Sequence, residues 1–204
     1  MGKISILLLV SSFFFLTFSS TCAIAKGHNE EKSWSEAFCP YKETTTELHF
    51  YLQDVLEGPN ATVWEVVKSP ISNSATSFGQ IRVFDDLITQ TPDPNSTKLG
   101  RAQGLITSAD LDVSAYNMNI NFVFTAGRYK GSTLTILGRN PINNVDRELS
   151  VVGGTGIFRM ARGYAISNTH SYNVSTNYGI LEYTIYVVYT NVPKVNNIEM
   201  VMDA

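Results

Sequence analysis

A carboxylate continues an apolar stripe near the start of the region rich in strand-forming residues. Leu48, Phe50 and Leu52 alternate along the chain, and the next residue on that side is Asp54. Residues two apart on a strand share a face, and burying an unpaired charge is costly. Asp54 therefore has two interpretations. It either reaches solvent or caps the turn at 57–59, or it is a buried acid with a raised pKa, suited to proton transfer.

The sequence offers little support for other kinds of catalytic site. His28, His49 and His170 are too scattered to form a metal site, and a Gly-x-Ser-x-Gly motif is missing. The glycine-rich run 153–156 looks like a phosphate loop, but Arg159 stands where the last glycine belongs and no helical pattern follows. We expect a tight turn between strands there. No metal or other cofactor is predicted, so any chemistry must rest on acids, bases and pocket shape.

The elements that position these groups are predicted to be strands. From Thr44 onward, short runs rich in Val, Ile, Phe, Tyr and Thr are broken by Gly, Pro, Asn and Asp. No sustained helical stripe interrupts them, which favours one antiparallel sandwich or barrel. Alternation also predicts inward faces for Met118 to Phe124 and for Leu181 to Tyr189. The predicted strands are 45–55, 62–68, 78–85, 99–109, 117–127, 132–139, 147–152, 161–171 and 179–190.

The N-terminus carries the pattern of an export signal. Lys3 precedes an apolar run from Ile4 to Phe18, and Ala23-Ile24-Ala25 follows as a cleavage site. A membrane anchor is the alternative, but this run is short of the ~20 apolar residues that span a bilayer. No later run is long enough, so we predict no membrane segment. The expected organisation is a signal peptide at 1–25, a flexible arm at 26–43, one β domain at 44–191 and a tail at 192–204.

Charge and cysteine content narrow the function further. Loss of the signal peptide removes one positive charge and takes the net charge from −3 to about −4. An acidic chain without a Lys/Arg cluster is a poor partner for nucleic acid. Cys22 leaves with the signal, so Cys39 stands alone as an inert, an interchain-paired or a reactive thiol, the first being favoured. Asn60, Asn95 and Asn173 begin sequons and are predicted glycosylation sites.

Four stretches of the chain resemble those of plant dirigent proteins. They are Leu48 to Asp54, Gly100 to Gly104, Gly131 to Leu134 and Val151 to Tyr164, and the similarity runs from about Thr45 to Tyr189. The resemblance implies an all-β fold, an eight-stranded antiparallel β-barrel similar to allene oxide cyclase. A barrel of this size has room for one small ligand. The resemblance also implies a homo-oligomer, dimer or trimer, that is secreted to the apoplast.

The resemblance implies a function in phenolic metabolism. Well-known dirigent proteins impart stereoselectivity on the coupling of phenoxy radicals, for example from coniferyl alcohol, to give optically active lignans. A separate oxidase of the laccase or peroxidase type makes the radicals, so such a protein is a stereochemical auxiliary rather than an enzyme. Other members are enzymes that cyclise or dehydrate quinone methides, as in pterocarpan formation. A barrel that only binds phenolics is a third, weaker alternative.

The resemblance also implies site residues. Asp54 matches a carboxylate in the first strand, and Arg147 matches an arginine just before the Gly-Gly-Thr-Gly strand. Lignan-forming members carry a second aspartate where this chain has Asn140. They also carry pocket tyrosines at the positions of Ile106 and Ser108. These departures favour a product other than the usual lignan.

The expected roles follow from the chemistry of a quinone methide. Asp54 would transfer a proton and Arg147 would hydrogen-bond the developing phenolate, provided that the two do not form a tight ion pair. The alternative is structural, with Asp54 capping a turn and Arg147 in a surface ion pair. If Asp54 is not the acid, the next carboxylates to consider are Asp85, Asp86 and Asp146.

Overall fold

The computed structural model describes residues 42–190, which form nine β-strands and two short 3-10 turns. The predicted signal peptide, Cys22, Cys39, His28, most of the predicted arm and the predicted tail lie outside these residues. Within 42–190, no helix is long and apolar enough to cross a membrane. The elements are β1 (Glu43–Val55), β2 (Val63–Val67), β3 (Ile81–Thr89), β4 (Lys98–Ser108), β5 (Ala115–Phe124), η1 (Gly127–Tyr129), β6 (Thr133–Pro141), β7 (Arg147–Thr155), η2 (Gly156–Phe158), β8 (Arg162–Asn173) and β9 (Tyr178–Thr190).

All nine predicted strands are present, with ends that differ by a few residues. The largest difference is in β3, predicted at 78–85 and observed at Ile81–Thr89. Phe78 to Gln80 belong to the preceding loop, where Gly79 has φ of +85° and the Ser69 hydroxyl donates a hydrogen bond to the Phe78 carbonyl at 2.6 Å. β1 begins at Glu43, the last residue of the predicted arm.

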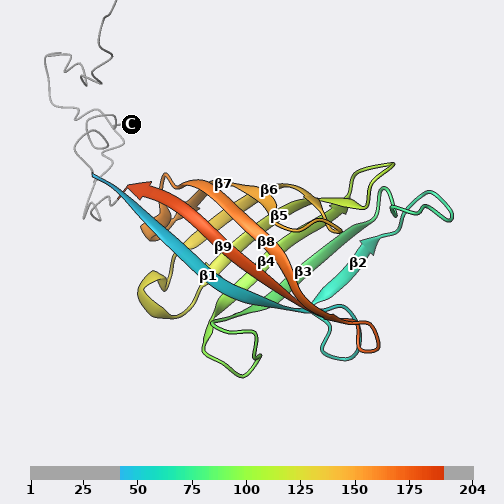
Figure 1. Cartoon of the computed structure of the whole chain (residues 1–204), viewed down its shortest axis with the longest axis horizontal. Helices are drawn as coiled ribbons and strands as arrows, with labels where there is room; N and C mark the ends of the chain where they lie inside the picture. Colours follow the sequence, from blue (N-terminus) through green and yellow to red (C-terminus); the bar gives the residue numbers. More distant parts are fainter. Residues whose placement is uncertain (1–41, 191–204) are drawn as a thin grey trace, which may run out of the picture. The chain divides into compact units, whose positions relative to one another are not determined.

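The sheet closes on itself as a barrel, which confirms the predicted fold. Neighbouring strands follow the order β1-β9-β8-β7-β6-β5-β4-β3, and β1 then pairs with β3 to complete the circle of eight (Figure 1). The closing register runs from Tyr51 opposite Thr89 to Gln53 opposite Leu87. β2 is the ninth strand, and it pairs with the other half of β3. Closure leaves few unpaired strand edges.

The core occupies the inside of the barrel, as the alternation predicted. Met118, Ile120, Phe122 and Phe124 of β5 are all buried, and so are Tyr183 and its alternate neighbours to Tyr189 on β9. Burial of each such large apolar side chain contributes about 1.5–3 kcal/mol to folding. The inward faces of the strands therefore hold most of the stabilising apolar area.

The prediction of a tight turn at 153–156 is wrong for its first three residues, which belong to β7. The chain reverses only at Gly156, which has φ of +63° and opens η2. Gly154 pairs with Leu134 in the strand, and only glycine fits there because a Cβ would come within 2.7 Å of the Phe158 Cβ and 2.5 Å of the Thr133 carbonyl oxygen. The glycine thus permits η2 to pack closely over the end of the barrel.

One end of the interior is filled with aromatic rings, and we call Phe124, Tyr129, Phe158 and Tyr189 the aromatic end. η1 supplies Tyr129 and η2 supplies Phe158, whose ring centroids lie 4.9 Å apart. Phe158 also lies 5.7 Å from Phe124 and 5.4 Å from Tyr189. The Tyr129 hydroxyl is within 3.2 Å of the Thr46 hydroxyl. The aromatic end is therefore a packed part of the core.

Candidate functional site

The opposite end of the interior collects polar side chains. β5, β7 and β9 all run toward the aromatic end, so their first residues lie at the other end of the barrel, together with the last residues of the antiparallel β1, β4, β6 and β8. Because side chains alternate between the two faces of a strand, most of these strands point one polar side chain into the barrel. We call the following group the polar end: Asp54, Arg82, Asp86, Asn140, Arg147, Ser167 and Tyr183.

Asp54 faces the interior at the end of β1. It pairs with Gly179 of β9, and a Cβ on Gly179 would lie 3.6 Å from the Asp54 Oδ2. Its Oδ1 is buried and has no hydrogen-bond partner among the described residues, so this oxygen does not cap the turn at 57–59. Burial raises the pKa of the Asp54 carboxyl to about 6, against the opposing effect of the positive charge on Arg82. The residue as a whole is half-buried, so the geometry agrees with an inward-facing acid whose Oδ1 is buried. Its catalytic role stays a prediction.

A second carboxylate, Asp86 on β3, is only 3% exposed and also faces inward. The Thr62 hydroxyl donates a hydrogen bond of 2.5 Å to its Oδ1. Burial raises the pKa of Asp86 well above its usual range, and the nearby Asp54 charge raises it further. The sequence analysis named Asp86 only as a substitute for Asp54. Its alternation with Phe84 was the signal that could have placed it inside.

Arg147, at the start of β7, is only 4% exposed. Its Nε donates to the Ser167 carbonyl at 3.2 Å, and its Nη1 donates to the Ile142 carbonyl at 2.9 Å and the Thr169 hydroxyl at 3.2 Å. In residues 42–190 it forms no ion pair, with Asp54 or any other carboxylate. The surface ion pair considered for Arg147 is therefore wrong. Burial lowers the pKa of this guanidinium.

Tyr183 and Asn140 complete the polar end. Tyr183 is fully buried, with its ring 5.4 Å from that of Phe122. Burial raises the pKa of its hydroxyl, and the charges of Arg147 and both inward carboxylates also act on this group. The Tyr183 hydroxyl and the Asn140 Oδ1 are buried and, within the described part, make no hydrogen bond with good geometry. Sequence reasoning placed Tyr183 inside but gave it no role, because a tyrosine on an apolar stripe is usually a core residue.

The two predicted pocket residues of β4 lie on the wall of the polar end. Ile106 is half-buried and pairs with Arg82 of β3, and Ser108 is buried opposite Tyr116 of β5. The Arg82 guanidinium lies 5.9 Å from the centre of the Tyr116 ring. The fold thus brings Asp54, Arg147, Asn140, Ile106 and Ser108 to one end of the barrel, and their function as site residues stays a prediction.

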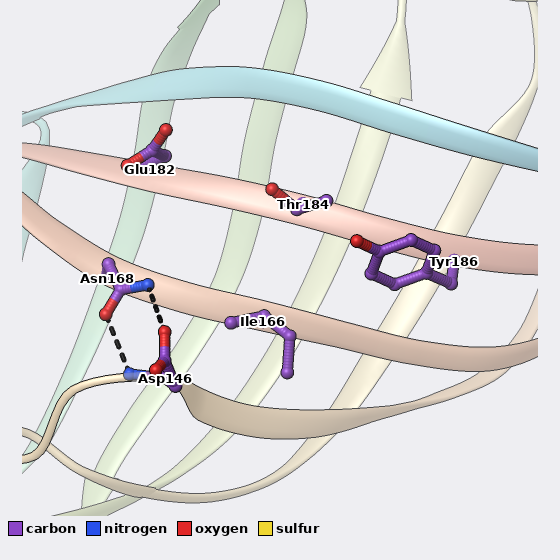
Figure 2. A pocket seen from close by; sticks show the side chains of 6 residues that line it. All are labelled: Asp146, Ile166, Asn168, Glu182, Thr184 and Tyr186. Atoms are coloured by element: carbon purple, nitrogen blue, oxygen red, sulfur yellow. Dashed lines mark hydrogen bonds between the residues drawn. The ribbon is translucent and has the colours of Figure 1, made fainter.

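The other two candidate carboxylates lie outside the barrel. Asp85 is exposed and accepts a hydrogen bond of 2.7 Å from the Arg101 Nε. Asp146 lies on the rim of a surface pocket of about 390 Å³ on the outer faces of β8 and β9 (Figure 2). There its backbone N–H and Oδ1 both pair with the Asn168 amide, at 2.7 and 3.0 Å. The outer pocket is lined by Asp146, Ile166, Asn168, Glu182, Thr184 and Tyr186.

The interior, rather than the outer pocket, is the candidate site. Several buried oxygens of the polar end retain unused hydrogen-bonding capacity, whereas the Asp146 carboxylate of the outer pocket is already bonded within the protein. Buried polar groups nearly always have partners, so each unpartnered one needs an explanation, and a binding or catalytic role is one of those explanations. Within 42–190, no group of three or more His, Cys, Asp or Glu side chains is placed to hold a metal.

The three predicted glycosylation sites are accessible. Asn60 follows β1, Asn95 lies between β3 and β4, and Asn173 ends β8, and all three are exposed. The Asn173 Oδ1 accepts hydrogen bonds from the Ser175 N–H and hydroxyl. Their modification stays a prediction.

Comparison with known proteins gives the family. The profile of the family described as Dirigent-like protein matches residues 45–188. The chain belongs to the dirigent family. Dirigent protein 21 of Arabidopsis thaliana is 37% identical over 193 residues, covering 92% of this chain and 99% of that protein.

Pterocarpan synthases are also among the relatives of this dirigent-family chain. Pterocarpan synthase 1 of Glycyrrhiza echinata is 39% identical over 149 residues, covering 72% of this chain and 79% of the relative. The solved structure of the pterocarpan synthase dirigent protein GePTS1 superposes with a TM-score of 0.70 at 36% identity. That match covers 76% of this chain and 90% of the other.

Proposed function

We propose that this dirigent-family protein controls the stereochemistry with which a phenol-derived quinone methide reacts inside the barrel. The observation that carries the proposal is that an inward-facing acid and a buried cation lie at the same end of the barrel without forming an ion pair. Asp54 has a buried, unpartnered Oδ1, and Arg147 has no carboxylate partner in residues 42–190. The acid can therefore exchange a proton while the cation stabilises charge that develops on the substrate.

The chemistry requires only proton transfer. In a cyclisation, a hydroxyl oxygen of the substrate adds to the exocyclic carbon of the quinone methide and forms a C–O bond. The electron pair of the exocyclic double bond moves into the ring, and the carbonyl oxygen becomes a phenolate. The hydroxyl proton passes to a base and an acid protonates the phenolate, so the composition of the substrate is unchanged. A dehydration that forms the quinone methide likewise needs an acid, because the hydroxyl leaves as water.

The polar end offers groups for each role. The Asp54 carboxyl, with a pKa of about 6, can act as acid or base near neutral pH. Arg147 and the Tyr183 hydroxyl can donate hydrogen bonds to the phenolate oxygen. The apolar wall that includes Phe122 can favour one face of a planar ring. About 1.4 kcal/mol between two approaches already gives a tenfold preference.

The second candidate function is stereoselective coupling of phenoxy radicals to lignans, with the radicals supplied by an external oxidase. The similarity to Dirigent protein 21 over nearly the whole of both chains supports it. Asn140 weighs against the lignan product, because an amide replaces the second acid of lignan-forming members. The pterocarpan synthase relatives support the quinone-methide candidate, in which the protein is an enzyme rather than an auxiliary.

Chiral chromatography distinguishes the two candidates. The purified protein is incubated with hydroxylated isoflavonoid precursors of quinone methides, and separately with coniferyl alcohol, each with and without a laccase. The proposal predicts an optically active cyclised product without the oxidase. Enantiomeric excess that appears only with coniferyl alcohol and laccase, at an unchanged rate of phenol consumption, would establish the second candidate instead. Racemic products in every arm would reject both.

We also propose that the protein works outside the cell as a glycosylated homo-oligomer. The exposed sequons at Asn60, Asn95 and Asn173 and the export signal of the sequence support this proposal. Intact-mass measurement of protein from a plant secretory host should show cleavage near Lys26 and added glycans. Sedimentation should show a dimer or trimer, and a strict monomer at micromolar concentration would contradict the assembly.

A further inference from the structure

Two carboxylates meet where the barrel changes strand partners. β1 and β3 pair as far as Gln53 opposite Leu87, so the next residues across this junction are Asp54 and Asp86. Beyond this point β1 leaves β3, and β2 takes its place from Val63 opposite Phe84. Side chains directly opposite on antiparallel strands have Cβ atoms about 4.5–5.5 Å apart. Continued by one residue, this register brings the two acids together on the inward face, and the charge of Asp54 acts on Asp86.

Neither acid is neutralised by a bonded cation. In the described residues, no salt bridge includes Asp54 or Asp86. Arg101, the cation nearest in register to Asp86, instead binds the outward Asp85. Arg82 acts on Asp54 through its charge alone. Two ionised carboxylates in a buried site repel each other strongly.

Thr62 fixes the geometry of this junction. Its hydroxyl donates to the Asp86 Oδ1 at 2.5 Å and accepts from the Val55 N–H at 3.1 Å. Its backbone N–H donates to the Val55 carbonyl at 2.8 Å, and its carbonyl accepts from the Asp85 N–H at 2.9 Å. One threonine therefore bonds to the residue after Asp54, to the residue before Asp86 and to the Asp86 carboxyl itself. This arrangement holds the two carboxyl groups at a set separation.

We propose that Asp54 and Asp86 form a carboxyl pair that shares a single proton at neutral pH, with Asp86 as a positioning residue that acts through Asp54. The two titrate together, because ionisation of one carboxyl opposes ionisation of the other. The other charged or titratable groups acting on Asp86 are Arg101 and Asp85 on the outer face and Tyr183 on β9.

The role of the pair in catalysis rests on the function proposed above. A singly protonated pair contains both an acid and a base. Asp54 can give its proton to the carbonyl oxygen of the quinone methide, and the pair regains one from the attacking hydroxyl. The pair ends each turnover in its starting state. The pair would thereby keep one proton available to higher pH than Asp54 alone.

The titration can be measured without any substrate. Carboxyl ¹³C resonances of the full chain are followed against pH in the wild type, Asp54→Asn and Asp86→Asn. The proposal predicts two coupled steps in the wild type, and loss of the upper step in either variant. Asp85→Asn is the matched control, because that carboxylate faces outward, and it should retain both steps. Two independent curves, with the Asp54 curve unchanged in Asp86→Asn, would overturn the pair.

The pH profile of product formation distinguishes a positioning role of Asp86 from a merely structural one, because a structural role would not shift the profile along the pH axis. Asp86→Asn should lower the pH above which product formation declines by a unit or more. At one pH unit above that new limit, product formation should be roughly tenfold lower than its maximum. Thr62→Val should shift the limit to higher pH, because the Thr62 hydrogen bond favours ionised Asp86. Thr62→Ser should restore the wild-type profile. Identical profiles in all variants would contradict the positioning role.

The two proposals fail in different ways. Coupled titration without any stereocontrolled product would support the carboxyl pair and reject the proposed function. A selective product together with independent titration would reject the pair alone.

Discussion

The two ends of the barrel interior are built from the same strands but have different composition. At the aromatic end, rings from η1 and η2 pack at 4.9 to 5.9 Å, and the Tyr129 hydroxyl has a partner in Thr46. At the polar end, oxygens of Asp54, Asn140 and Tyr183 are buried without partners in residues 42–190. Burying a polar group without a hydrogen bond costs about 1–3 kcal/mol in proteins. One end therefore stabilises the fold, while the other reduces its stability and keeps reactive groups available.

This difference has a simple physical basis. Packing one end tightly makes the barrel rigid, and rigid strands hold the groups at the other end in fixed positions. Sites of binding and catalysis commonly lower stability, because the groups they need would be better satisfied by another arrangement. Tyr183 lies between the two regions. Its ring packs on Phe50, which contacts Phe124 of the aromatic end, while its hydroxyl lies at the polar end. The comparison leads to four predictions.

The largest effect is expected for Asp54→Asn. Because the amide cannot give or take a proton, product formation should fall by ~10²–10⁴-fold, the usual contribution of a positioned acid or base. The variant should fold and assemble normally. Chiral chromatography and sedimentation test these two parts. Asp85→Asn, on the outer face, is the control and should behave as the wild type. Full activity in Asp54→Asn would place the acid elsewhere.

Substitutions at the aromatic end should lower the free energy of unfolding. Phe158→Ala removes a fully buried ring that contacts three others, and such truncations cost about 3–5 kcal/mol. Urea unfolding at pH 7 measures the loss. Ile157→Ala is the matched control, because the neighbouring Ile157 is 38% exposed and should cost far less. A loss below about 1 kcal/mol in Phe158→Ala would show that the rings of this end do not form a cooperative core.

Stability should depend on pH through Asp54. The folded-state pKa of about 6 exceeds the ordinary value of 3.8, so the folded protein binds this proton more tightly than the unfolded chain. Wild-type stability should therefore fall as the pH rises from about 4 to 6. Asp54→Asn lacks this loss and should be more stable than the wild type by roughly 1–3 kcal/mol at pH 7, with no such gain below pH 4. Urea midpoints at both pH values measure the difference.

The smallest stability change is expected for Tyr183→Phe. Its ring remains packed, and the removed hydroxyl has no partner of good geometry within the described residues, so stability should change by less than about 1 kcal/mol. Product formation should still fall by roughly tenfold, because one donor to the phenolate is lost. Tyr189→Phe at the aromatic end should leave product formation unchanged. An equal loss of product formation in both variants would contradict the claim that only the polar end takes part in the reaction.

Much of this protein could be predicted from local patterns of residues. Alternation of apolar and polar side chains is decided by strand geometry, so it located all nine strands and the inward faces of β5 and β9. The same alternation put Asp54 on the apolar face of its strand but left open whether it reached solvent or lay buried. The resemblance of four stretches to dirigent proteins then predicted closure into a barrel. The other site residues that it implied lie at the same end as Asp54, and they are Arg147, Asn140, Ile106 and Ser108.

Other features depended on contacts between residues far apart in the chain. Gly153 and Gly154 look like a turn in the sequence, but they extend β7 because they pair with Thr135 and Leu134 of β6. Asp85 and Asp86 are adjacent and chemically identical. Alternation with Phe84 puts Asp86 on the inward face, and the tertiary structure then supplies Arg101, the partner of Asp85 on the outer face.

The tertiary structure also decided which carboxylate Asp54 would meet. The junction that sets Asp54 opposite Asp86 arises where β2 replaces β1 beside β3, and Thr62 bonds to both sides of it. A single strand determines the direction in which its own side chains point, and that information is local. Which acids face each other, and how strongly each alters the protonation of the other, depends on strand register across a closed sheet.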